Sequence, residues 1–210
     1  MKERVGIFGG CFDPITNLHL LTAEAARVNI SLDRVIFEPV SESYSYGGKS
    51  PVVSYSSRVE MIKKAVSSNP MFEVGCMDGE VSDSRSADNF ASTCELLELY
   101  ADNFSYKLFF ICGSDVFSSM HKWRDVDKLF KQFEVIVVDR AGSEISNSVI
   151  YPNSFLSAHK NKIHRVQPYV SSDVSSTKVR NIHSSGGSVR YMVPDAVYDY
   201  IIQHDLYKTL

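Results

Sequence analysis

The chain has 210 residues, of which 44% are hydrophobic and 22% are charged. This composition is typical of a globular protein with a full core, and we expect a single domain over residues 1–210. A net charge of -3 at pH 7 argues against a protein that coats nucleic acid through its positive charge. No apolar stretch is long enough for a signal peptide or a membrane span, so we expect an intracellular protein, cytoplasmic or nuclear and not secreted, with no membrane or nucleic-acid partner.

Short apolar segments alternate with amphipathic segments along the whole chain. Strands are predicted at residues 4–9, 34–38, 72–76, 107–112 and 134–138, and the apolar helix faces begin at Leu18, Tyr55, Phe90 and Pro194. On the first of these helices the spacing indicates that Leu18, Leu21, Ala25 and Val28 share the apolar face. Such alternation predicts an α/β fold of the Rossmann-like type: a doubly wound parallel sheet with helices on both faces, followed by a C-terminal helical segment.

The strongest local signal lies between the first predicted strand and the first predicted helix. Gly9 and Gly10 precede a short polar segment, and His19 follows in the first turn of the helix. Glycines allow a bulky anion to approach the backbone, and a helix N-terminus offers N–H groups and positive potential to phosphate. The segment is neither a dinucleotide fingerprint nor a Walker A loop. An isolated histidine at this place can also be an ordinary capping or surface residue.

Basic residues concentrate near the C-terminus. Between His159 and Arg190 there are six basic residues and one acidic residue. Such a run can be a solvated face, but it includes Lys178 and Arg180, which follow Ser175, Ser176 and Thr177. This serine and threonine run reads as a helix N-terminus, which caps the helix or supplies a second set of amides to a phosphate.

Three ordered motifs resemble the nucleotidyltransferase superfamily. The segment from Gly10 through Phe12, Pro14 and Thr16 to His19 is similar to its first signature, and residues 174–180 are similar to its second, I-S-S-T-x-I-R. The segment Ile111-Cys112-Gly113-Ser114-Asp115, Trp123, Arg140-Ala141-Gly142 and the ending resemble the nicotinamide/nicotinate mononucleotide adenylyltransferases. Because the resemblance covers nearly the whole chain, it implies adenylyl transfer from ATP to one or both of these mononucleotides, with NAD⁺ or deamido-NAD⁺ and pyrophosphate as products.

The resemblance also implies the residues of the site. His19 and Arg180 are the expected catalytic residues. The expected ATP-binding residues are Gly9, Gly10, Cys11, Phe12, His19, Gly113, Asp115, Ser175, Ser176, Thr177, Lys178 and Arg180. The expected mononucleotide-binding residues are Cys11, Lys49, Thr93, Asp115, Trp123 and Arg140. Trp123 can otherwise be a core anchor, and Lys49 a solvated loop residue.

The chemistry needs alignment and charge rather than a protein base. The attacking phosphate has a second pKa of about 6 and is already an anion at neutral pH, so the enzyme supplies positioning and hydrogen-bond donors for the charge on the triphosphate. We expect Mg²⁺ or another divalent cation, held by ATP oxygens and water and not by protein ligands. The four cysteines lie far apart without a C-x-x-C pair, which argues against a zinc site or a disulfide framework.

Two departures from the family pattern affect the site. Thr16 stands where the H-x-x-H form of the signature has its first histidine, and Met77 stands where one branch often has a Trp after the third strand. The resemblance allows a homo-oligomer and leaves open the choice between the amide and acid mononucleotides. Two alternatives stay open: another transferase of the superfamily, such as one acting on phosphopantetheine, or a non-catalytic module that senses NAD.

Overall fold

The computed structural model describes residues 2–42, 50–77, 92–139 and 154–208. The chain divides into two compact units, each built from segments that are far apart in the sequence. Unit 1 comprises Met1–Gly9, Leu21–Ile36 and Ala91–Asp173. Unit 2 comprises Gly10–Leu20, Phe37–Phe90 and Val174–Leu210.

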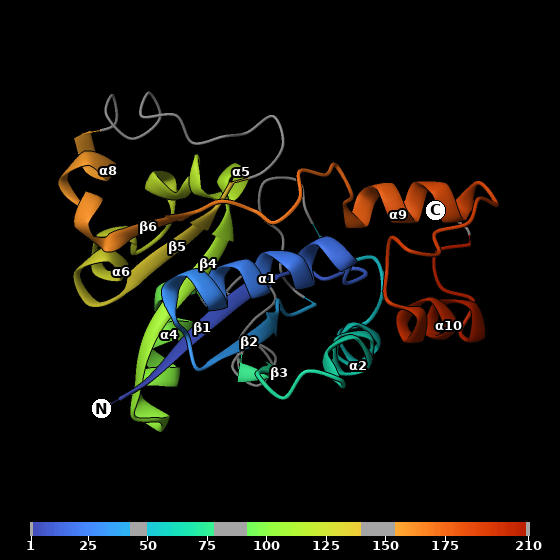
Figure 1. Ribbon diagram of the computed structural model, residues 1–210, viewed down its shortest axis with the longest axis horizontal. Coiled ribbons are helices and arrows are strands. Elements are labelled where there is room, and N and C mark those ends of the chain that lie inside the picture. Colours follow the sequence, from blue (N-terminus) through green and yellow to red (C-terminus); the bar gives the residue numbers. More distant parts are fainter. Residues whose placement is uncertain (1, 43–49, 78–91, 140–153, 209–210) are drawn as a thin grey trace. The chain divides into compact units, whose positions relative to one another are not determined.

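The described strands form a six-stranded sheet in the order β3-β2-β1-β4-β5-β6 (Figure 1). Their bounds are β1 Glu3–Gly10, β2 Arg34–Pro39, β3 Phe72–Val74, β4 Tyr106–Gly113, β5 Glu134–Val138 and β6 Ile163–Val166. In unit 1 the pairs β1–β4, β4–β5 and β5–β6 are all parallel. The parallel sheet and the α/β class are therefore confirmed, and all five predicted strands are present, with the third reduced to three residues.

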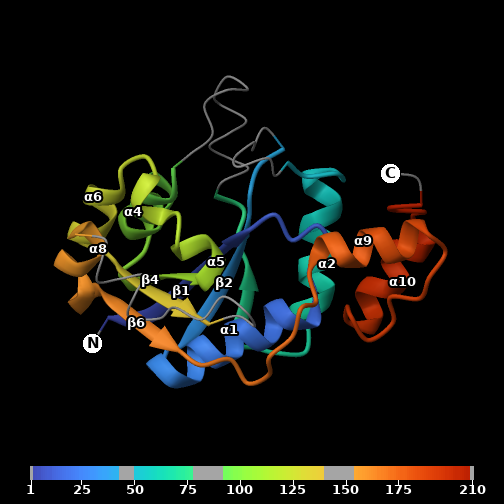
Figure 2. The same ribbon diagram turned by 90° about the horizontal axis from the view of Figure 1, so that it is seen from above.

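The helices also follow the predicted order. The described helices are α1 Asn17–Ile30, α2 Tyr55–Val66, α4 Thr93–Asn103, α5 Ser114–Phe117, η1 Met120–Lys122, α6 Val126–Gln132, α8 Ser154–Ala158, η2 Lys160–Lys162, α9 Ser176–Ser184 and α10 Asp195–Gln203. Figure 2 shows α1 and α4 on opposite faces of β1 and β4. Helices flank the sheet, as the alternating pattern predicted.

The core of unit 1 consists of its central strands. Ile7, Phe109, Ile111 and Val137 are fully buried, on three adjacent parallel strands. Strands covered on both faces need continuous apolar runs instead of alternation, and residues 107–112 and 134–138 have such runs. Gly6 also contributes to this packing, because a Cβ there would lie 2.6 Å from the Ile111 side chain.

The predicted apolar face of α1 is confirmed at Ala25, which is buried, but it is wrong at Leu21 and Val28. Leu21 and Val28 are exposed, whereas the buried residues of the helix are Ala23, Ala25 and Ala26. The small alanine side chains allow a close approach of the helix, and the larger residues remain outside. Spacing alone favoured the larger apolar residues, and this is why the sequence pattern was wrong at these two positions.

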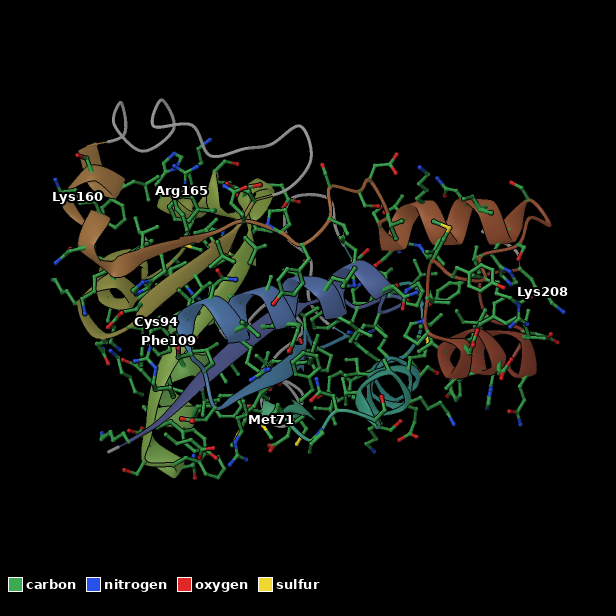
Figure 3. All side chains as sticks on the ribbon, viewed as in Figure 1. Met71, Cys94, Phe109, Lys160, Arg165 and Lys208 are labelled. Atoms are coloured by element: carbon green, nitrogen blue, oxygen red, sulfur yellow. The ribbon has the colours of Figure 1, made fainter. Side chains whose placement is uncertain are left out.

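Strand β6 was not predicted. It contains only four residues, and among them His164 and Arg165 are charged or polar, so no apolar run marks it. The pairing of β6 with β5 and an ion pair between Arg165 and Asp139, 3.4 Å long, hold it in the sheet. Figure 3 shows Arg165 on β6 and Lys160 at the preceding turn, both in unit 1.

In unit 2, helix α10 packs against α2, and both figures of the ribbon show them side by side (Figures 1 and 2). Met61 and Ile62 on α2 and Val197 and Ile201 on α10 are fully buried. Pro194 is the N-cap residue of α10, which agrees with a proline-initiated helix at this point.

None of the helices in the described part of the chain has the length and apolar character that a membrane span requires.

Candidate active site

The glycine turn lies where β1 ends, and its glycines make room for aromatic rings. A Cβ at Gly10 would lie 3.1 Å from the ring of Phe12, and a Cβ at Gly9 would lie 3.3 Å from Phe110. Neither glycine has a positive φ, since Gly186 is the only described glycine that does. The close approach that these glycines permit therefore includes packing within the protein as well as the predicted access for an anion.

The ring of Phe12 is buried and packs against neighbouring rings. The φ of Phe12, 47°, lies in the left-handed region, which is unfavourable for a residue with a large side chain. The ring is 2% exposed and packs edge-on against Phe37 and His19, with centroids 5.6 and 5.2 Å apart. The side chain of Phe12, one of the predicted ATP-binding residues, is therefore packed inside the protein.

The ring of His19 is oriented by Thr16. The backbone N–H of Thr16 donates to Nδ1 of His19 at 3.0 Å, and the Thr16 hydroxyl lies at the same distance from this nitrogen. Because a backbone N–H can only donate, Nδ1 is an acceptor and the ring proton is on Nε2. Thr16 is fully buried, so the residue that replaces the first histidine of the H-x-x-H form sets the tautomer of His19.

Helix α9 is capped by Ser175, as predicted. The Ser175 hydroxyl accepts from the backbone N–H of Lys178 at 3.2 Å. On one side of the helix, the Ser176 hydroxyl donates to the carbonyl of Pro14 at 2.8 Å, and Nη1 of Arg180 donates to the carbonyl of Asp13 at 2.7 Å. Since Ser176 has a single hydroxyl proton, in this arrangement it can accept from a ligand but not donate to one.

Another side of α9 borders a shallow groove of about 500 Å³. The lining residues are Ser175, Thr177, Lys178, Asn181, Ile182, Ser185 and Gly187. Three of the predicted ATP-binding residues, Ser175, Thr177 and Lys178, line this groove, whereas Ser176 and Arg180 contact the loop after β1. The two groups are connected, because Nη2 of Arg180 also donates to the Thr177 hydroxyl at 3.4 Å.

Unit 1 carries the other half of the predicted site. Asp115 lies in the first turn of α5, directly after β4, and is exposed. Its carboxylate covers Gly113, where a Cβ would lie 2.7 Å from Oδ1 of Asp115. Trp123 is half-buried, at the end of η1, with its ring edge-on to Phe110 at 5.8 Å. Asp115 is at the carboxyl end of β4, where open α/β sheets bind ligands.

Of the remaining predicted mononucleotide-binding residues, Thr93 lies in the part of the chain that the structure describes. Thr93 is the first residue of α4 and half-buried, after a capping box of Ser92 and Glu95. Lys49 and Arg140 lie outside the described residues, so their roles stay predictions.

The basic run near the C-terminus does not act as one feature. Lys160, Lys162 and Arg165 belong to unit 1, whereas Lys178, Arg180 and Arg190 belong to unit 2. Arg190 forms an exposed ion pair with Asp195, 3.3 Å long, and its guanidinium lies over the ring of Tyr198. Within this run, only Lys178 and Arg180 of unit 2 are on α9.

Sequence reasoning missed a buried polar cluster below the glycine turn. The carboxylate of Asp13 accepts from the Tyr207 hydroxyl and from the backbone N–H of Val52, each at 2.5 Å. Arg58, which is fully buried, donates from Nη1 to the carbonyl of Cys11 at 2.9 Å. Arg58 precedes the apolar residues of α2 by three and four positions, and this placement of a charge on an apolar face was the available signal.

A protein metal site is absent from the described residues: no group of three or more His, Cys, Asp or Glu side chains there is arranged to hold an ion. Asp13, the buried carboxylate nearest the turn by sequence, is already occupied by two donors.

The fold and this arrangement define the class of protein. Residues 7–182 match the family model described as cytidylyltransferase-like, and the chain belongs to this family. The match extends from β1 into α9 and so includes both the glycine turn and the capped helix.

Curated relatives narrow the assignment. The chain is 36% identical to a probable nicotinate-nucleotide adenylyltransferase of Citrifermentans bemidjiense, over 97% of this chain and 98% of the relative. It is 31% identical to a protein of the same name from Leifsonia xyli subsp. xyli, over 100% and 96% of the two chains. Identity at this level over nearly the full length of both chains places it within the family of nicotinate-nucleotide adenylyltransferases.

Solved structures share the fold. A nicotinic acid mononucleotide adenylyltransferase of Plasmodium falciparum, complexed with NaAD, matches with a TM-score of 0.77 and 18% identity, over 99% of this chain and 98% of that one. A putative nicotinate-nucleotide adenylyltransferase of Vibrio parahaemolyticus matches with a TM-score of 0.67 and 15% identity, over 99% and 97%. At these identities the likeness concerns the fold alone.

Proposed function

We propose that this chain transfers the adenylyl group of ATP to nicotinate mononucleotide and releases pyrophosphate, with deamido-NAD⁺ as the other product. The observation that carries the proposal is the pair His19 and Arg180 at one loop: Thr16 holds the His19 ring with its proton on Nε2, and Arg180 contacts Asp13 of the same loop. A neutral donor and a permanent cation suit an α-phosphate that gains charge. The acid substrate is chosen because the relatives carry that name.

In the proposed reaction an oxygen of the mononucleotide 5′-phosphate attacks the α-phosphorus of ATP. The new P–O bond forms as the bond from the α-phosphorus to the bridging oxygen breaks, and the electron pair leaves with pyrophosphate. Nε2 of His19 donates to an α-phosphate oxygen, and Arg180 and Lys178 balance the charge of the triphosphate. The backbone at Gly10 and Cys11 lines the phosphate path, so positioning and electrostatics provide the catalysis.

Mg²⁺ or another divalent cation would accompany ATP and neutralise part of its charge. The described residues offer no carboxylate cluster for it, so its ligands would come from the phosphates and water.

The proposal is tested by pyrophosphate release from ATP and Mg²⁺ with each of three acceptors: nicotinate mononucleotide, nicotinamide mononucleotide and phosphopantetheine. We expect kcat/KM for the nicotinate form to exceed that for the other two at least tenfold, a discrimination of roughly 1.4 kcal/mol. Faster turnover of the nicotinamide form would reverse the substrate assignment. If none of the acceptors leads to pyrophosphate release and the chain nevertheless binds NAD measurably, a sensor would be favoured.

Trp123 is proposed to stack on the pyridine ring of the mononucleotide. Trp123→Ala should raise KM for the mononucleotide about tenfold and change KM for ATP less than about twofold, since aromatic stacking on a base contributes roughly 1–3 kcal/mol. Initial rates at varied concentrations of each substrate measure the two constants. Trp123→Phe is the matched control, because it keeps a ring against Phe110 and should recover part of the affinity. An equal rise in both constants would contradict the stacking role.

A further inference from the structure

The C-terminal turn of the chain reaches the loop that carries the candidate catalytic residues. Tyr207 lies after α10, is 4% exposed and has a φ of 61°. Its hydroxyl donates to Oδ1 of Asp13, 194 positions earlier in the chain, at 2.5 Å. An unfavourable left-handed backbone at a large residue is retained only where the surroundings hold the side chain in place. In this turn the buried ring of Tyr207 and its hydrogen bond to Asp13 hold the side chain in place.

The Asp13 carboxylate is completely engaged by unit 2. It is 1% exposed, and its second oxygen accepts from the backbone N–H of Val52 at 2.5 Å. Burial, and next the Asp13 carboxylate, raise the pKa of the Tyr207 hydroxyl. The phenol therefore keeps its proton and remains a donor through the neutral range.

The same peptide segment holds the candidate catalytic groups on its other side. The carbonyl of Asp13 accepts from Nη1 of Arg180 at 2.7 Å, and the carbonyl of Pro14 accepts from the Ser176 hydroxyl at 2.8 Å. Two residues after Pro14, Thr16 orients the His19 ring. A shift of the Asp13 side chain would therefore move the carbonyl that positions Arg180.

Arg58 holds the backbone of Cys11, two residues before Asp13. Its Nη1 donates to the carbonyl of Cys11 at 2.9 Å and its Nε to the carbonyl of Val53 at 3.4 Å. Burial lowers the pKa of the Arg58 guanidinium, whereas the negative charge of Asp13 opposes that shift. Asp13 and Arg58 are thus both buried and hydrogen-bonded to neighbouring segments, an arrangement that tolerates little displacement because each buried polar group depends on its partners.

We propose that Tyr207 is a positioning residue for adenylyl transfer: its hydrogen bond to Asp13 fixes the loop whose backbone holds Arg180 and whose Thr16 orients His19. This inference rests on the proposed function. In this role Tyr207 touches no reacting atom. It affects catalysis only through its hydrogen bond to Asp13.

The test is Tyr207→Phe, which removes the hydroxyl and keeps the buried ring. With ATP, Mg²⁺ and nicotinate mononucleotide we expect kcat to fall about tenfold, with both KM values within about twofold of wild type, since alignment in the transition state and not ground-state binding is lost. Tyr200→Phe is the matched control, because Tyr200 on α10 contacts His204 and Lys64 through its ring. It should keep wild-type kcat.

A double-mutant cycle separates positioning from general destabilisation. In an Arg180→Met background the effect of Tyr207→Phe should shrink to about threefold or less, because one of the two groups that the loop positions is gone and only His19 remains. Asp13→Asn, which keeps the shape of the side chain, should lower kcat alone and add little to Tyr207→Phe. A full tenfold effect in the Arg180→Met background would overturn the positioning role.

Wild-type turnover distinguishes the two proposals. If the wild-type chain releases pyrophosphate and Tyr207→Phe has unchanged kcat, the positioning role is wrong and the proposed function stands. If the wild-type chain releases none with any acceptor, the proposed function is wrong and the positioning role is rejected with it.

Discussion

His19→Ala is expected to lower kcat about a hundredfold or more while KM for ATP changes little. The proposed role of Nε2 is to donate to the α-phosphate as charge builds there, and removing one such preorganised donor costs roughly 10²–10³ in rate. Single-turnover and steady-state pyrophosphate release measure this directly. The geometry that supports the role is the pair of contacts from Thr16 to Nδ1, which leave the ring proton on Nε2.

Two further variants sharpen this prediction. His19→Gln can place an amide N–H near the position of Nε2 and should recover part of the lost rate. His204→Ala removes an exposed histidine of unit 2, whose ring stacks on Tyr200, and should leave kcat unchanged. Near-normal turnover of His19→Ala would contradict the assigned role.

Arg180→Met is expected to lower kcat about a thousandfold. Arginines that stabilise phosphoryl-type transition states contribute about 10³–10⁵ in rate, and Arg180 also holds the carbonyl of Asp13. Arg180→Lys keeps the charge without the planar fork and should recover only part of the rate. The measurement is kcat at saturating ATP and mononucleotide.

Arg190→Met is the matched control for Arg180. Arg190 belongs to the same basic run but pairs with Asp195 at the surface, and exposed ion pairs contribute little to stability. Its loss should change kcat less than about twofold. A comparable loss in both variants would indicate that general positive charge, and not the placement of Arg180, supports the reaction.

Much of the fold was predictable because buried parallel strands have continuous apolar runs, which remain recognisable even where one residue of the run is polar. Residues 107–112 illustrate this, since nearly every position is apolar and the strand formed as expected. Where packing depends on small or polar residues, prediction was wrong: α1 buries its alanines, and β6 carries His164 and Arg165 in a short edge strand. Neither choice follows from hydrophobic spacing, because each depends on how closely a neighbour approaches.

In the candidate site, too, local features could be predicted, whereas features that depend on packing could not. Ser175 could be predicted as a cap, since serine before a helix has a local preference that does not depend on the rest of the chain. That Ser176 donates to Pro14, whereas Thr177 and Lys178 line a groove, could not be predicted from the motif. The face on which each residue lies depends on what packs beside α9.

By itself the sequence determined the α/β class, the position of the glycines after the first strand, the helix that carries His19 in its first turn and the helix that begins with Ser176, because these follow from local preferences and apolar periodicity. Only the tertiary structure decided that Asp13 is buried under Tyr207, and that Arg58 holds the carbonyl of Cys11. Those partners are far apart along the chain, and a buried polar group obtains its hydrogen bonds from whichever segments the fold brings to it. The loop could be identified from the sequence, whereas the contacts that hold it in place follow only from the fold.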